Sequence, residues 1–370
     1  MEINEYIKKK KELYISLIEF LNSEEDTSID SSEVLSMSLD VLRQNADQEE
    51  IKFFLSLIIQ ITHNHHRNLF FDKKIEQILL YFSRIIKQSL SNSEIFNIFK
   101  SSKRILLFLI KREIIILDDS ILEFFLNNAA YRHFFSPEIK PKISKENLKK
   151  YYSKSLNIDS FEEKRKKGEN DSMICELIRN DNVVDFISHV TSKNIPLSTT
   201  AIRPSMFEMN LLLNEKQPSL IEYAAFYGSI QIVRFLQYSN VKLEPSLWIY
   251  SIHSNNAELI HYLEENDVSP PNNSYETCLI EAIKCHHNEI AQYINDNLMQ
   301  KSDNQMSDEL LESILRYYNY LYFPEDLNQK SIFFFLVQFN YSKIVNFIIE
   351  MKKNEFDEIL IFKKIMIYFY

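Results

Sequence analysis

Apolar residues along the chain recur at intervals of three and four residues, the spacing of one face of an α-helix. The segment "KKIEQILLYFSRIIKQ" at 73–88 has this pattern. Its apolar face is formed by Ile75, Ile78, Leu79, Phe82, Ile85 and Ile86. The stretches 5–21, 49–62 and 120–127 are similar, and polar breaks such as 22–32 separate them. The pattern predicts an all-α fold that begins with a helical domain at 1–156.

A polar stretch dense in charge follows at 157–172 and contains Gly168, one of only two glycines. Its composition is typical of a linker between domains. We therefore expect a charged linker at 157–172 and a second domain at 173–370.

The second domain contains segments that resemble one another. Four of them align without gaps: "SLIEYAAFYGSIQIVRFL" (219–236), "SLWIYSIHSNNAELIHYL" (246–263), "TCLIEAIKCHHNEIAQYI" (277–294) and "SIFFFLVQFNYSKIVNFI" (331–348). The predicted units lie near 173–196, 219–245, 246–276, 277–300 and 331–355. The segment 307–327 offers one more helix and a hidden, degenerate unit, and the helices of 1–156 could be eroded copies of the same unit.

Each unit has the pattern of a helix, a short turn and a second helix. One column of the turn is occupied by Gly228, Asn255, His286 and Asn340. Glycine ends helices by adopting a positive φ, and Asn and His are among the other residues that adopt it most readily. A single helix pair cannot bury both of its apolar faces, so the units are expected to stack into a solenoid.

The segments "AAFYGSIQIVRFL" and "HHNEIAQYI" resemble the ankyrin repeat, which has an alanine-rich first helix, a Gly-His turn and an "xEIVxxLL" second helix. His287 occupies the column of the turn histidine. The arrangement of the blocks resembles, more closely still, a large and divergent ankyrin-containing family from protists that carries a domain of unknown function. The resemblance covers about 173–350 and implies an ankyrin-like solenoid with an extended surface for binding a protein.

Two glycines among 370 residues exclude two kinds of nucleotide-binding loop. The G-x-x-x-x-G-K-[ST] phosphate loop and the G-x-G-x-x-G dinucleotide turn each need several glycines close together. No cofactor is predicted, and no residue is assigned a catalytic, cofactor-binding or metal-binding role.

The formal net charge of −10 argues against nucleic-acid binding, which depends on clustered Lys and Arg. The basic run in "EEKRKKGEND" at 162–171 is interpreted as a solvated helix face and linker, and a patch for RNA or an anionic membrane is the alternative. Three cysteines, without a paired framework, indicate a reducing compartment, and the expected location is cytoplasmic. The longest apolar stretches are about half the roughly 20 residues that cross a bilayer, so no membrane insertion is expected.

The tripeptide Cys285-His286-His287 is the first candidate for a metal site or a Cys-His nucleophile, because it places a thiol next to two imidazoles. Cys278 and Cys285, if joined by a helix, would lie roughly 10 Å apart along its axis, too far to share a zinc ion. Adjacent residues of a helix point about 100° apart, which also makes Cys285 and His286 poor partners as nucleophile and base. We interpret these residues as the turn between two stacked helices.

A second cluster, "HNHHR", contains His63, His65 and His66. On a helix, the first two would point about 200° apart, which is unfavourable for chelation, although a turn could bring them together. We interpret this cluster as the polar end of a helix.

The predicted function is a non-enzymatic protein–protein interaction scaffold with an unknown protein partner. Self-association is a further possibility, and the alternative function is a metal-binding hydrolase or sensor that uses the histidine clusters. Trp248, the only tryptophan, is expected to be a packed core residue rather than an exposed anchor for a partner. The apolar segment "DEILIFKKIMIYFY" at 357–370 is expected to dock on the last helix pair or to precede a further repeat.

Overall fold

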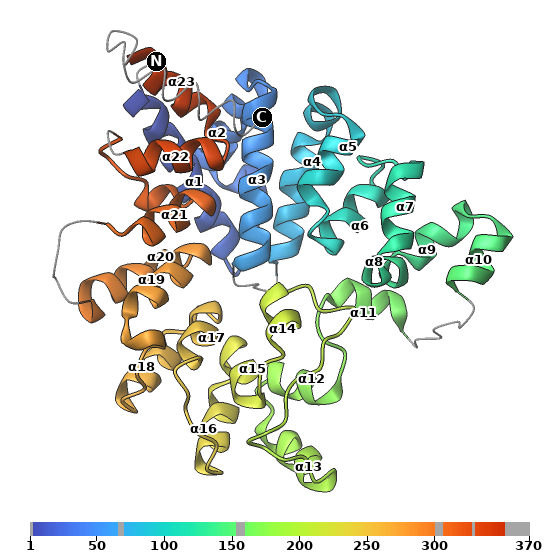
Figure 1. Cartoon of the computed structure of the whole chain (residues 1–370), viewed down its shortest axis with the longest axis vertical. Coiled ribbons are helices and arrows are strands. Elements are labelled where there is room, and N and C mark those ends of the chain that lie inside the picture. The colour runs from blue at the N-terminus through green and yellow to red at the C-terminus, as the bar shows by residue number, and fades with distance from the viewer. Residues whose placement is uncertain (1–2, 66–69, 153–159, 300–305, 328–329, 352–370) are drawn as a thin grey trace.

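The computed structural model of the chain describes residues 3–65, 70–152, 160–299, 306–327 and 330–351. These residues form helices joined by short turns, with one isolated antiparallel bridge between Ala201 and Ser219 (Figure 1). The prediction of an all-α class is confirmed. The predicted docking of 357–370 and the candidate His66 lie outside the described residues.

The amino-terminal helices follow the predicted apolar faces. They are α1 (Ile3–Asn22), α2 (Glu33–Asn45), α3 (Gln48–Asn64), α4 (Phe71–Ser89), α5 (Asn92–Phe99), α6 (Lys103–Lys111), α7 (Asp119–Asn127), α8 (Ala129–Phe134), α9 (Ser136–Ile139) and α10 (Lys145–Tyr151), with the short 3₁₀ helices η1 (Ile29–Ser31) and η2 (Lys140–Lys142). On α4 the predicted face is buried at Ile75, Ile78, Leu79, Phe82 and Ile86. Polar residues begin many of these helices; Ser91, for example, forms a capping box with Glu94 at the start of α5.

The charged stretch that was expected to be a linker contains helix α11 (Phe161–Lys167). Its Arg165 is only 2% exposed and forms hydrogen-bonded ion pairs with Glu138 and Glu162. This part of 157–172 is therefore packed against the amino-terminal helices through a buried guanidinium.

Beyond α11 the helices occur mostly in pairs. The pairs are α12 (Met173–Arg179) with α13 (Val183–Ser192), α15 (Leu220–Phe226) with α16 (Ile230–Tyr238), α17 (Leu247–His253) with α18 (Ala257–Glu265), α19 (Tyr275–Lys284) with α20 (Asn288–Tyr293) and α22 (Lys330–Gln338) with α23 (Ser342–Met351). The other elements are α14 (Leu211–Lys216), η3 (Pro271–Asn273), a π-helix η4 (Ile294–Leu298), α21 (Asp308–Arg316) and η5 (Tyr320–Tyr322). The first helices of successive pairs pack on one another, as in the contacts of α15 with α17 and of α17 with α19.

Each turn inside a pair, and the similar turn between α21 and η5, contains one residue of positive φ. The residues are Asp181 (47°), Gly228 (70°), Asn255 (52°), His286 (58°), Tyr318 (56°) and Asn340 (61°). The positive φ predicted for Gly228, Asn255, His286 and Asn340 is confirmed. Tyr318, between α21 and η5, has the same conformation within 307–327, where the second helix is reduced to a single 3₁₀ turn.

The residue after the positive-φ position links its turn to the preceding pair. Its side chain donates a hydrogen bond to a carbonyl at the end of the preceding first helix: Ser229 Oγ to Ile178 (2.6 Å), His287 Nδ1 to Ile252 (2.7 Å), Asn319 Nδ2 to Ile283 (3.1 Å) and Tyr341 OH to Leu315 (3.0 Å). Asn256 makes a related bond to the carbonyl of Gly228 (3.3 Å). We call this row of bonds the turn ladder. Each of these carbonyls also accepts a hydrogen bond from a backbone N–H of its own turn, for example Ile252 from Asn255 at 3.2 Å, so the ladder adds a second donor that comes from the next turn.

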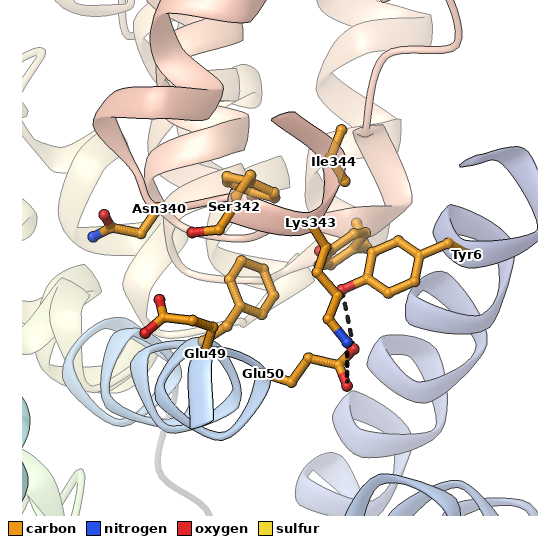
Figure 2. A pocket seen from close by; sticks show the side chains of 10 residues that line it. Tyr6, Glu49, Glu50, Asn340, Ser342, Lys343 and Ile344 are labelled. Carbon is orange, nitrogen blue, oxygen red and sulfur yellow. Dashed lines mark hydrogen bonds and ion pairs between the residues drawn. The ribbon is translucent and has the colours of Figure 1, made fainter. Parts of the chain in front are cut away.

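The carboxyl-terminal helices share a core with the amino-terminal ones. One buried cluster contains side chains of α1, α3 and α4 together with Leu315, Leu336 and Ile344 of α21, α22 and α23, and these helices lie beside α1 in Figure 1. Figure 2 shows the ends of Tyr6 and Lys343 pointing to the carboxylate of Glu50 on α3. Tyr6 OH donates to this carboxylate at 3.2 Å, and Lys343 Nζ pairs with it at 3.0 Å. The two ends of the described chain therefore close on each other.

Candidate site: a buried histidine cluster beside a polar cavity

The two histidine clusters of the sequence meet in the folded chain. His65 follows the last residue of α3, and its Nδ1 donates to the carbonyl oxygen of Cys285 at 2.8 Å. Its Nε2 lies 2.6 Å from Oδ1 of Asn22 at the end of α1. The rings of His65 and His287 are 4.9 Å apart between centroids. The interface between α1, α3 and the turn at 285–287 is therefore built from both sets of residues.

His286 faces α1. Its Nδ1 lies 3.0 Å from the hydroxyl of Tyr14, and both side chains are completely buried. Burial disfavours the imidazolium ion, so the pKa of His286 is lowered well below its ordinary value. Within the described part of the chain, Nε2 of His286 has no hydrogen-bond partner. His286 and His287 thus act in the described structure as a positive-φ turn residue and as a rung of the turn ladder.

Cys285 lies against His253, which in turn contacts Glu281, and the sequence predicted a role for neither residue. The imidazole of His253, at the end of α17, contacts Oε1 of Glu281 through Nε2 at 2.6 Å. The sulfur of Cys285 lies 3.5 Å from Nδ1 and 3.6 Å from Nε2 of the same ring. Burial opposes the ionisation of Glu281, but the hydrogen bonds and charges of His253 and Lys284 outweigh it and lower the pKa of Glu281 to about 2.

The three donor groups of His253, Glu281 and Cys285 are close enough to be considered as a metal site, since their ligand atoms lie within 4.8 Å of one another. A zinc ion would lie in the plane of the imidazole, about 2 Å from its nitrogen and about 2.3 Å from the sulfur. The sulfur is almost equidistant from the two ring nitrogens, which places it over the face of the ring and away from both in-plane lone pairs. His253 would have to turn before one ion could reach both ligands.

The same residues form the arrangement of a catalytic triad, in which Cys285 would be the nucleophile, His253 the base and Glu281 the carboxylate that orients the base. Two properties of Cys285 oppose that chemistry. Its side chain is completely buried, and burial raises the pKa of its thiol well above the ordinary value. The thiolate, which is the reactive species, is therefore disfavoured. Cys175 and Cys278 are likewise free thiols in buried positions.

A polar cavity of about 280 Å³ opens beside His253. It is lined by His65, Lys167, Glu169, Glu176, Arg179, Asn180, Glu208, Asn210, Phe226, Tyr227 and His253. These residues come from the ends of α3, α11, α12, α15 and α17 and from the loops before α12 and α14. In Figure 1 the end of α3 lies next to α14, close to the ends of α15 and α17.

The charged groups of the lining are held in defined positions. Arg179 Nε pairs with Glu169 at 3.0 Å, while its Nη1 donates to the carbonyl of Asn170 and to the hydroxyl of Tyr223. The carboxylate of Glu208, which is 2% exposed, accepts hydrogen bonds from the backbone N–H groups of Asn170 and Asn210. The cavity therefore presents fixed charges of both signs.

Sequence reasoning found His65 and the turn at 285–287 but not the cavity. The lining residues are far apart in the sequence, and no local spacing relates Glu176 or Glu208 to His253. Trp248 is fully buried, and its Nε1 donates to the carbonyl of Val268 at 2.8 Å, so its predicted place in the core is confirmed.

Comparisons with known proteins give no relative: no family model, no curated protein and no solved structure matches the chain. Among the described residues, none of the helices combines the length and the apolar character needed to cross a membrane.

Proposed function

We propose that the chain is a non-enzymatic protein–protein interaction scaffold in which ankyrin-like helix pairs stack side by side. The observation that carries the proposal is the turn ladder. A repeated bond from each turn to the preceding pair fixes the pairs at one spacing, and stacked pairs create a continuous surface on which a partner can be bound. Four of its side chains differ in chemistry, namely Ser229, His287, Asn319 and Tyr341, yet each donates to the same kind of carbonyl.

The chemistry around Cys285 also supports a scaffold. A buried neutral thiol over the face of an imidazole suits packing better than catalysis. The hydrogen bond between His253 and Glu281 joins two neighbouring pairs, because His253 ends α17 whereas Glu281 lies on α19.

The test is an unbiased partner search by proximity labelling in the cells from which the chain comes, followed by titration of each purified candidate against the full chain. The expected result is saturable binding with a fixed stoichiometry. Light scattering of the chain alone distinguishes self-association from binding to a foreign protein. Saturable turnover of a hydrolase substrate by the purified chain, lost on changing Cys285 or His253, would refute the scaffold.

The second candidate is the metal-binding protein, which the proximity of His253, Glu281 and Cys285 favours. Elemental analysis of the purified chain decides between the two. Stoichiometric zinc that is lost in both His253→Gln and Cys285→Ser would establish a metal protein, whereas zinc at a trace level in the parent supports the scaffold.

A further inference from the structure

We propose that the polar cavity beside His253 binds a basic side chain, an arginine guanidinium or a lysine ammonium, presented by a partner protein. The inference rests on the proposed scaffold function and names the chemistry of the partner's anchor residue. Four features of the cavity carry it: its carboxylates, the helix ends that surround it, its aromatic faces and its size.

Carboxylates are the most numerous charged groups of the lining. Glu169, Glu176 and Glu208 face two cationic side chains, Lys167 and Arg179. Lys103 does not line the cavity; its Nζ donates to the carbonyl of Met206 at 2.6 Å, and its positive charge interacts with Glu208. The chain as a whole has a formal charge of −10, which attracts a basic partner toward the cavity.

In three of the helix pairs, the first helix ends at the cavity. Arg179, Phe226 and His253 are the last residues of α12, α15 and α17, and all three line it. The carboxyl-terminal end of a helix carries a partial negative charge and favours cations over anions. The lining already shows this preference, because the guanidinium of Arg179 lies there beside Glu169.

Aromatic faces complete the lining. The rings of Phe226 and His253 are stacked with centroids 5.2 Å apart, and Arg179 lies 5.8 Å from the centroid of Tyr227. A cation near the face of such a ring is attracted by its quadrupole. The volume of about 280 Å³ lies just below the usual range of about 300–1,000 Å³ for small-molecule pockets, which suits one side chain better than a cofactor.

The test compares two probes that differ mainly in charge. N-acetyl-arginine amide carries a guanidinium, and N-acetyl-citrulline amide has a neutral urea of nearly the same shape. Both are titrated into the full chain by calorimetry at low ionic strength. We expect the arginine probe to bind at least about tenfold more tightly, because charge-assisted hydrogen bonds to carboxylates are about twice as strong as neutral ones.

Two matched variants locate the site. Glu176 lines the cavity with a half-exposed side chain 3.4 Å from Lys167. Away from the cavity, Glu258 of α18 forms a similar exposed pair with Arg234 of α16 at 3.0 Å. Glu176→Gln is expected to weaken the arginine probe by about fivefold, the upper end for an exposed ion pair. Glu258→Gln is expected to leave its binding unchanged, and thermal melting verifies that both variants are folded.

Equal binding of the two probes, or an equal effect of the two variants, would overturn the proposal. Tighter binding of N-acetyl-glutamate amide than of the arginine probe would also overturn it. The failure of this proposal can be distinguished from a failure of the scaffold function. A protein partner that binds equally well to the parent and to Glu176→Gln would leave the scaffold in place and remove the cavity as its anchor.

Discussion

Replacement of His287 by alanine tests the turn ladder at one rung. The imidazole is 3% exposed, and its Nδ1–H is the donor that the structure places on the carbonyl of Ile252. Its removal deletes this bond, but the Ile252 carbonyl still accepts from the backbone N–H of Asn255 at 3.2 Å, so the loss is that of one ordinary hydrogen bond, about 0.5–1.5 kcal/mol. Lost packing of the ring adds about 1 kcal/mol. We expect His287→Ala to lower the free energy of unfolding of this region by about 1.5–2.5 kcal/mol.

The chain provides its own control for that change. Asn319 performs the same task one pair later through an amide N–H. His287→Asn should therefore recover the hydrogen-bond part of the loss, whereas His261→Ala, at a position with a half-exposed side chain on α18, should change the free energy by less than about 0.5 kcal/mol.

The assay is urea unfolding followed by the fluorescence of Trp248. It is the only tryptophan, it is fully buried, and it lies on α17, the same helix as Ile252. If the alanine and asparagine variants unfold at the same urea concentration, the bond to Ile252 does not stabilise the stack. An alanine variant that unfolds like the parent would refute the ladder as a source of stability.

Three further predictions concern the buried cluster. His286 stays neutral when buried but gains a proton once unfolded, so stability should fall as the pH drops below about 6.5; His286→Asn should reduce this dependence in the Trp248 assay, and an unchanged pH profile would contradict it. The pKa of Glu281 is lowered to about 2, so its stabilisation is present above pH 4.5 and is lost as the pH falls toward 2; Glu281→Gln should therefore destabilise the chain more at pH 7 than at pH 3, and an equal loss would argue against ionic stabilisation. Finally, Cys285 should react with a thiol reagent only after unfolding, because it is buried and its pKa is raised; rapid labelling of this residue in the native chain, found by mass spectrometry, would reveal an activated thiolate.

The sequence by itself determined the helices and the conformation of their turns. The spacing of apolar residues on α4 predicts which face is buried, since that information is contained in one helix period. The column of Gly228, Asn255, His286 and Asn340 predicts positive φ, because few residue types adopt that conformation readily. Both are local properties, so neighbouring residues were sufficient to find them.

Only the tertiary structure decided what the reactive side chains contact. His65 lies 220 positions before Cys285 in the chain, yet its ring binds that residue's carbonyl. Cys285 meets His253 of the neighbouring helix pair, and the carboxylates of the cavity come from α12 and from two separate loops. Such contacts depend on how helices stack and how the two ends of the chain close, which no local spacing encodes. The letters Cys-His-His therefore predicted a turn, and the fold alone placed that turn against α1 and α3, next to the cavity.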